Sequence, residues 1–280
     1  QLLAKRYKVP FVFEMRDVWP DSIVDIGRVS RFNPLVMVMR MMANRLYRSA
    51  SRILMVMPNA ADYLKHKGIA ITKLHWLPNF VNFDTVPKPH NNNHDVLHVV
   101  YAGSHGLAND LSVVVQSAKQ LQDQGAPVKI TMIGDGAERE KLQQRAKDLA
   151  LQNIEFLGSV PKNTIYDHLQ GADVFLLLIA DAPVFQWGIS LNKLFDYLAL
   201  AKPIISNTQH VYHPTINEPL FYSIKPQDPS ALTQAILHFQ QMPAKDRQAF
   251  AQEGRRYCEQ HHDAKELSAQ LESILQECVQ

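Results

Sequence analysis

The chain has 280 residues, 46% of them hydrophobic and 20% charged, so it is long enough for two domains of ordinary size. Its formal net charge is +2 and it has no dense basic run interleaved with aromatic residues, which argues against a nucleic acid partner. Cys258 and Cys278 have neither disulfide nor metal-ligand spacing, and no apolar run reaches the roughly 18 residues of a membrane-spanning helix. We therefore expect a cytoplasmic protein.

The first part of the chain alternates between strand and helix patterns. Residues 1–8 have the pattern of the end of an amphipathic helix, and a polar turn is expected at 16–22. The expected strands are 11–14, 52–57 and 75–78, and the expected helices are 34–51 and 59–68. This order predicts a parallel sheet. Because Gln1 lies within a helix pattern, we expect a fragment that lacks an N-terminal part.

A second alternating unit follows a segment with Pro87, Pro89 and three consecutive asparagines, a composition typical of a linker. The expected strands are 96–101, 128–133, 154–157, 173–179, 203–206 and 221–224, and the expected helices are 111–122, 138–149, 162–170, 192–199, 230–241 and one or two within 245–278. This pattern predicts a complete doubly wound α/β domain.

We accordingly divide the chain into four parts. They are a partial N-terminal domain at 1–86, a linker at 87–95, a second domain at 96–250 and C-terminal helices at 251–280, which we expect to pack across the domain boundary.

The loop 184–191 leads directly into the helix pattern at 192–199. The first N–H groups of a helix lack intrahelical partners and attract anions, and Lys193 adds a positive charge there. This segment therefore predicts a phosphate site. A solvated surface position for Lys193 is the alternative.

Glycine turns follow two strands of the second unit. Gly103 and Gly106 let the backbone approach a ligand closely after the first strand; the alternative is a tight turn with His105 exposed to solvent. The turn at 134–136 has a similar composition, and we expect it to be structural.

Together the motifs resemble glycosyltransferase family 4. They are Tyr-Ala-Gly at 101–103, Ile-Gly-Asp-Gly-Ala-Glu-Arg-Glu-Lys-Leu at 133–142, Phe-Leu-Gly-Ser-Val-Pro at 156–161, Gly-Ala-Asp-Val-Phe-Leu at 171–176 and Asn-Lys-Leu-Phe-Asp-Tyr at 192–197. Arg-Asp-Val-Trp-Pro-Asp-Ser at 16–22 further resembles the bacterial surface-polysaccharide branch, which includes N-acetyl-L-fucosamine transferases. The resemblance implies a GT-B fold, with two Rossmann-like doubly wound domains, the N-terminal one incomplete here.

The resemblance also implies a donor site on the second domain. In the family's motif of two glutamates separated by seven residues, the second acid falls on Asp196, which would accept bonds from the ribose, and the first falls on Gly188. Because glycine cannot replace a carboxylate, we expect the sugar contact to come from backbone or from Gln186 or Ser190.

The family's Arg and Lys after the first strand are replaced by Ser104, His105 and Asn109, so Lys193 is our candidate for the missing charge. Val160 would border the base. The full set of expected donor-binding residues is Gly103, Ser104, His105, Gly106, Val160, Gln186, Gly188, Ser190, Asn192, Lys193 and Asp196.

The implied reaction is transfer from a nucleoside diphosphate sugar, with retention and without a metal or cofactor. Lys193 and the N–H groups at Asn192 would stabilise charge on the leaving diphosphate. The sequence has no Asp-x-Asp pair and no His/Cys cluster at ligand spacing. Arg16 and Asp17 are expected in the cleft, near the position of a functional histidine in relatives; an Arg–Asp pair bracing the next turn is the alternative.

The implied donor is a UDP-linked N-acetylated deoxysugar, and the implied acceptor is a polyprenyl-diphosphate-linked glycan of O-antigen, capsule or exopolysaccharide synthesis. Residues 34–48 combine apolar side chains with Arg40, Arg45 and Arg48. They indicate either peripheral contact with the anionic inner membrane or a core helix with methionine filling gaps, and we expect a mixture of the two, with a buried face and a basic rim. A nucleotide-sugar 2-epimerase and a non-catalytic binding module, the latter favoured by Gly188, remain alternative functions.

Overall fold

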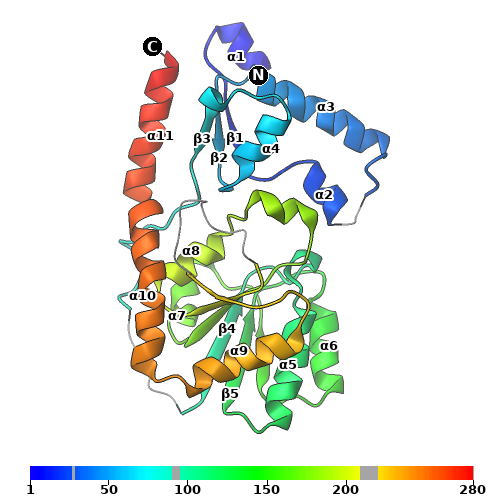
Figure 1. Cartoon of the computed structure of the whole chain (residues 1–280), viewed down its shortest axis with the longest axis vertical. Helices are drawn as coiled ribbons and strands as arrows, with labels where there is room; N and C mark the ends of the chain where they lie inside the picture. The colour runs from blue at the N-terminus through cyan, green and yellow to red at the C-terminus, as the bar shows by residue number, and fades with distance from the viewer. Residues whose placement is uncertain (27–28, 90–94, 209–219, 280) are drawn as a thin grey trace.

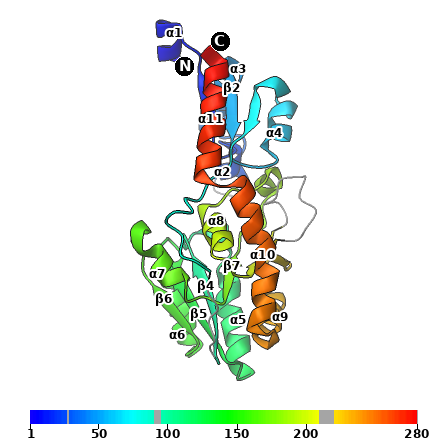
Figure 2. The ribbon, with the colours of Figure 1, turned by 90° about the vertical axis from the view of Figure 1, so that its left-hand side faces the viewer.

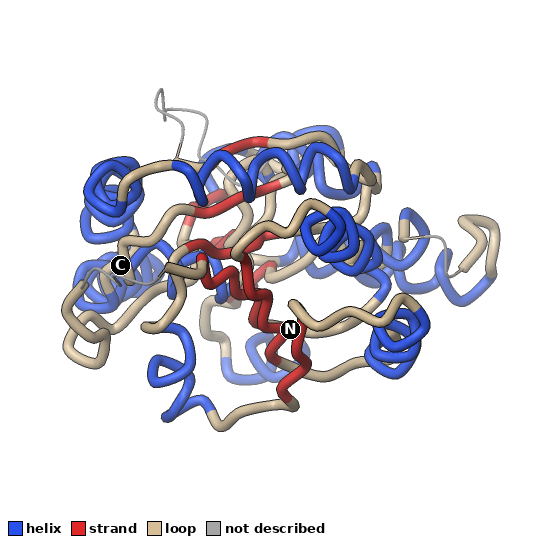
Figure 3. Tube along the Cα trace, turned by 90° about the horizontal axis from the view of Figure 1, so that it is seen from below, coloured by secondary structure: helices blue, strands red, loops and turns tan. Residues whose placement is uncertain are grey.

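The computed structural model of the chain describes residues 1–26, 29–89, 95–208 and 220–279 (Figure 1). They form two parallel sheets, one of three strands in the order β1-β2-β3 and one of six in the order β6-β5-β4-β7-β8-β9. The predicted α/β class with two parallel sheets is confirmed. Figure 3 shows strands through the middle of the molecule and helices on both sides.

The first unit has the predicted alternation of strands and helices. Its elements are α1 (Leu2–Tyr7), β1 (Val12–Met15), α2 (Asp21–Asp25), α3 (Pro34–Ser49), β2 (Arg52–Met55), α4 (Ala60–His66), η1 (Ile71–Lys73) and β3 (Leu74–Trp76). The Asn33 side chain accepts a bond from Leu35 N and Pro34 occupies the first turn, a favourable helix start. The expectation of a turn throughout 16–22 is wrong, because α2 begins at Asp21; one helical turn is too short to show a period.

The second unit is doubly wound about its central strand. Its elements are β4 (Leu97–Ala102), η2 (Leu107–Asn109), α5 (Ser112–Asp123), β5 (Val128–Ile133), α6 (Arg139–Asp148), β6 (Ile154–Leu157), η3 (Lys162–Thr164), α7 (Ile165–Leu169), β7 (Val174–Leu177), η4 (Pro183–Trp187), α8 (Asn192–Ala199), β8 (Ile204–Ser206), β9 (Tyr222–Ser223) and α9 (Pro229–Gln241). The chain runs from β4 outward to β6 and then returns to pair β7 on the other side of β4. The carboxyl ends of β4 and β7 therefore form the switch point at which such sheets bind ligands.

The last two helices connect the units. α10 (Ala244–His261) packs against α8, and α11 (Ala264–Val279) runs beside the first unit (Figure 2), where Gln270 Nε2 donates to Trp76 O at 3.2 Å. Val81, after β3, pairs with the break between the two helices through bonds to His262 O and from Ala264 N. Residues 90–94 of the expected linker lie outside the described residues.

Candidate functional site

The turn after β4 is fixed by the turn after β5. Gly103 N donates to Ile133 O at 2.9 Å and His105 N to Asp135 O at 2.8 Å, so pairing continues beyond the strands. A Cβ placed at Gly134 would lie 2.0 Å from Gly103 O. The second glycine turn is therefore structural, as expected, and it holds the backbone of the first in place.

Lys193 reaches this turn from the start of α8. Its Nζ donates to Tyr101 Oη at 2.9 Å and to Asn109 Oδ1 at 3.3 Å, and lies 4.2 Å from the centre of the Tyr101 ring. A Cβ at Gly103 would be 3.0 Å from Nζ. Burial lowers the pKa of Lys193 to about 7, because desolvation disfavours the charged form. The alternative of a solvated Lys193 is wrong.

His105 points into the protein. Its side chain is fully buried, with ring centres 5.8 Å from Tyr101 and 6.3 Å from Phe156. Burial, followed by the charge of Arg139, lowers its pKa. The alternative of a solvent-exposed His105 is wrong, and Ser104 is the exposed side chain of the turn.

Asp196 lies one turn after Lys193 on α8, on the same side of the helix. Its Oδ1 accepts a bond from Tyr166 Oη at 2.7 Å, and burial raises its pKa. Tyr166 belongs to α7 and has no motif around it, so the sequence alone gives no sign of its contact with Asp196. Of the other expected donor residues, Asn192 is exposed and Val160 is half-buried.

Gly188 and Ser190 contact the first unit. Gly188 has φ +93° and a Cβ there would lie 2.6 Å from Pro58 Cδ, so both the conformation and the space require glycine. Ser190 O accepts a bond from Asn79 Nδ2 at 2.7 Å. Where the resemblance leads us to expect an acid, the chain thus has a contact between the units.

Trp187 strengthens this contact and Gln186 lies outside it. The Trp187 ring meets Tyr63 edge-on at 5.5 Å, and its carbonyl accepts a bond from Asn59 N at 3.1 Å. Gln186 is exposed and lines a cavity of about 750 Å³ that also includes residues after β7, β8 and β9. Among the described residues that line this cavity, Gln186 is the only one that belongs to the expected donor site.

Arg16 and Asp17 follow β1 and are exposed. Arg16 Nη1 lies 3.6 Å from Glu14 Oε1, and Asp17 Oδ1 accepts a bond from Val18 N at 2.7 Å. The alternative of a bracing Arg–Asp pair is therefore wrong. Neighbouring β2 leads at its carboxyl end to Pro58, which contacts Gly188, so this edge of the sheet faces the second unit.

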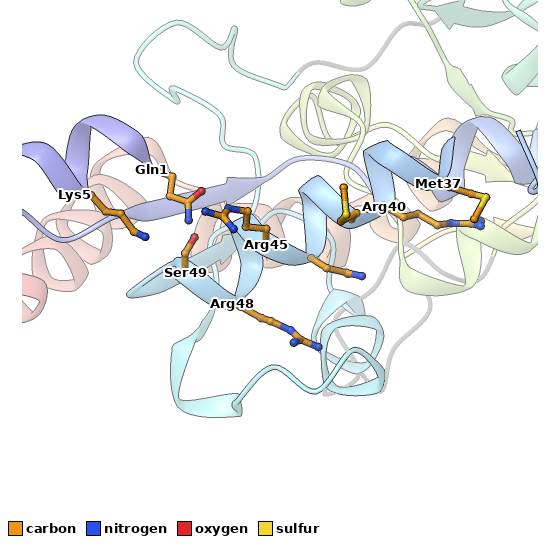
Figure 4. Close-up of a pocket in the computed structure, with 9 residues that line it drawn as sticks. Gln1, Lys5, Met37, Arg40, Arg45, Arg48 and Ser49 are labelled. Atoms are coloured by element: carbon orange, nitrogen blue, oxygen red, sulfur yellow. The ribbon is translucent and has the colours of Figure 1, made fainter. Parts of the chain in front are cut away.

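The outer face of α3 is apolar and exposed. Only Val36 and Tyr47 of this helix are buried, whereas Met37, Met41 and Met42 are between 57% and 66% exposed. The interpretation of these methionines as core filler is therefore wrong. A groove of about 830 Å³ runs along this helix and is lined by Gln1, Lys5, Met37, Arg40, Met41, Asn44, Arg45, Arg48 and Ser49. Figure 4 shows the side chains of these residues.

The described residues form no helix that combines the length and the apolar character needed to span a membrane. They also contain no group of three or more His, Cys, Asp or Glu side chains placed to hold a metal ion.

The model of the family described as "Glycosyl transferases group 1" matches residues 82–257 of the chain. A curated relative, WcaL of Escherichia coli strain K12, carries the name of a colanic acid biosynthesis glycosyltransferase and is 25% identical over 170 residues. That match covers 59% of this chain and 41% of the relative, so the chain matches less than half of the relative's length.

Solved structures share the fold over nearly the whole chain. Anabaena HepE in complex with UDP and glucose has a TM-score of 0.77 at 12% identity, covering 99% of this chain and 74% of HepE. Sucrose-phosphate synthase from Thermosynechococcus elongatus has a TM-score of 0.76 at 15% identity, covering 98% of this chain and 70% of that protein. The fold is that of GT-B glycosyltransferases.

Proposed function

The chain belongs to the family of group 1 glycosyl transferases, and on this premise we propose that it transfers a sugar from a nucleoside diphosphate sugar to a lipid-linked glycan. The observation that carries the proposal is the Lys193 ammonium beneath the glycine turn at the carboxyl end of β4. Negative charge grows on the diphosphate as the sugar leaves, and a fixed positive charge stabilises that transition state more than the ground state.

The remaining donor contacts follow from their positions on and around α8. The N–H groups at the start of α8 would bind the diphosphate together with Lys193, and Asp196 would accept bonds from the ribose hydroxyls. The turn 103–106 and Val160 would border the nucleotide. Lys193 and these N–H groups would supply the charge for a metal-independent, retaining transfer.

UDP is the proposed nucleotide. HepE, which shares the fold, has been crystallised with UDP and with UDP-glucose. The segment Arg16–Ser22 resembles the family 4 branch that includes N-acetyl-L-fucosamine transferases, which supports an N-acetylated deoxysugar as the transferred group. Arg16 and Asp17 would then act at the acceptor side of the cleft.

The proposed pathway is synthesis of O-antigen, capsule or exopolysaccharide on the cytoplasmic face of the inner membrane. WcaL is named for colanic acid biosynthesis, which supports this class of product. The exposed methionines of α3 together with Arg45 and Arg48 would rest on anionic lipid and bring the first unit, residues 1–86, to a polyprenyl-diphosphate-linked acceptor. Residues 96–250 would bind the donor.

A non-catalytic nucleotide-sugar-binding module is the second candidate, favoured by Gly188. Its packing against Pro58 leaves no carboxylate at the position where the family has its first acid. Such a module would bind the donor through Lys193 and Asp196 but transfer nothing. Release of UDP from a UDP-sugar only when a lipid-linked acceptor is present separates the two candidates.

The first test is calorimetric titration of the chain with UDP and GDP in the absence of metal. We expect saturable binding of UDP that is tighter than that of GDP. Lys193→Ala should weaken it by roughly 1–3 kcal/mol through loss of a charge-assisted bond, and Asp196→Asn should weaken UDP and UMP alike. Tighter binding of GDP would contradict the choice of nucleotide, and no binding by folded protein would contradict the donor site.

A further inference from the structure

Two neutral side chains surround the Lys193 ammonium. Tyr101 is the last tyrosine before the turn, on β4, and Asn109 ends η2, after the turn. Both are at most 9% exposed, whereas Ser104 between them is exposed. The Lys193 ammonium is thus held by one side chain that precedes the turn and one that follows it.

The hydrogen bonds of Tyr101 and Asn109 determine how each of them can interact with Lys193. Tyr101 Oη donates its only proton to Ser104 O at 2.8 Å, and Asn109 Nδ2 donates to the same carbonyl at 2.9 Å. The oxygens of both groups therefore remain free to accept from Lys193. A protonated lysine has three N–H donors, so one remains for a ligand.

We propose that Tyr101 and Asn109 are positioning residues that hold the Lys193 ammonium under the 103–106 turn, with its third N–H directed to a donor phosphate. This inference rests on the proposed function, since it assigns the diphosphate to Lys193. In this arrangement the positive charge that contacts the diphosphate comes from Lys193 on α8, whereas the family has Arg and Lys on the turn itself. Gly103 is part of the arrangement because a Cβ there would meet Nζ at 3.0 Å.

The surroundings make the charge of Lys193 depend on these two residues. The titratable groups that interact with it are the Tyr101 hydroxyl and the His105 imidazole, whose pKa is lowered mainly by burial and also by the charge of Lys193. Asp196, one turn along the same helix, accepts its bond from Tyr166 instead. Burial sets the pKa of Lys193 at about 7, so the ammonium is half-populated near neutral pH. Loss of either accepting oxygen should lower this pKa further.

The test is the association constant of UDP with the full chain, measured by calorimetry at several pH values between 6 and 8. At each pH the constant is divided by that of the Lys193→Met variant, and this quotient is called the ratio. This division removes the titration of UDP itself. The wild-type ratio should fall about tenfold over this range, because a pKa near 7 loses the charged form above it. Tyr101→Phe and Asn109→Ala should each lower the ratio about tenfold at pH 6 and move the midpoint to lower pH, whereas Asn109→Asp should move it to higher pH.

Tyr197→Phe is the matched control. Tyr197 lies on the same helix, and its hydroxyl donates to Ala102 O and accepts from Ala102 N. It should change the ratio less than about twofold and leave the midpoint in place. A separate readout, acetylation of Lys193 by acetic anhydride followed by mass spectrometry without nucleotide, should give the same order of midpoints.

The outcomes distinguish the positioning role of Tyr101 and Asn109 from the proposed donor site. If the wild-type chain binds UDP and the Tyr101 and Asn109 variants behave like Tyr197→Phe, the positioning role is overturned and the proposed function stands. If folded wild-type chain binds UDP at neither pH, the proposed donor site is overturned, and the positioning role with it. Opposite midpoint shifts in Asn109→Ala and Asn109→Asp support the proposal.

Discussion

The six-stranded and the three-stranded sheets pair their strands in the same parallel way but are covered differently. The six-stranded sheet contributes to two buried clusters, one containing Val99 and Tyr101 and the other Val100 and Ala102 from alternate positions of β4. The three-stranded sheet contributes to one buried cluster, in which three of four residues of the central strand β2 are buried but the edge strands β1 and β3 have one and none. The core of the first unit includes Val184 from η4 and is packed by Trp187. The second unit thus has a two-sided core of its own, and the first depends on side chains that the second provides.

The largest expected effect is the loss of unfolding free energy when an aromatic side chain in the core of each unit is truncated. Phe175 on β7 is fully buried and stacks on Tyr197 at 4.1 Å, so Phe175→Ala should lower the free energy of unfolding by about 3–5 kcal/mol. Phe13 on β1 is half-buried and meets Tyr47 edge-on at 5.5 Å. Phe13→Ala should cost about half as much in urea unfolding. Equal costs would break the comparison.

The junction between the two units should respond to pH. His262, between α10 and α11, is 2% exposed, its Nδ1 lies 2.8 Å from Asn79 O, and its ring stacks on Phe195 at 4.2 Å. Burial lowers its pKa from 6.5 to about 4. The unfolded chain therefore takes up the proton first, so this contribution is complete above pH 6.5 and is lost as the pH falls toward 4.

Between pH 7.5 and pH 5 this one group should remove about 2 kcal/mol of unfolding free energy. His262→Gln keeps a donor for Asn79 O but does not titrate. Urea unfolding at both pH values should show a smaller loss in the variant than in the wild type. The same loss in both would place the pH sensitivity elsewhere.

Much of this architecture follows from the sequence, and the contacts between distant segments do not. Periodicity located the strands 128–133 and 154–157 and the helix 192–199 at the bounds observed, because each has a regular apolar pattern. The bond between Lys193 and Tyr101 joins residues 92 positions apart. A local sequence pattern carries no information about contacts between such distant positions. The sequence therefore indicates a positive charge at the start of α8 but not the direction in which the Lys193 side chain points.

The same limit applies to Gly188. The resemblance to the family indicates only that an acid is missing at this position. The structure shows that a side chain there would meet Pro58 of the other unit. Short 3-10 segments such as η4 were expected as loop, because five residues cannot show a helical period.

Replacement of Gly188 tests how tightly the units are joined. Gly188→Ala meets both a positive φ and Pro58, while Gly68→Ala meets a φ of +75° with nothing within 4 Å. Gly68→Ala should lose about 1 kcal/mol from backbone strain. Gly188→Ala should lose about 3 kcal/mol, because φ +93° with ψ 165° is a conformation that essentially only glycine adopts and because its Cβ clashes with the Pro58 ring. Equal losses in urea unfolding would show that the loop moves away from Pro58 at no cost.

The smallest expected effect on stability is at the exposed face of α3, in the first unit. Met41 is 66% exposed, so Met41→Gln should change the free energy of unfolding by less than about 0.5 kcal/mol. Met55→Gln, at a position 3% exposed on β2, is the matched control and should cost several times more, because it buries an amide. If Met41→Gln leaves stability unchanged but weakens cosedimentation with vesicles of anionic lipid, the apolar face of α3 serves binding. A loss of stability equal to that of Met55→Gln would instead make it part of the core.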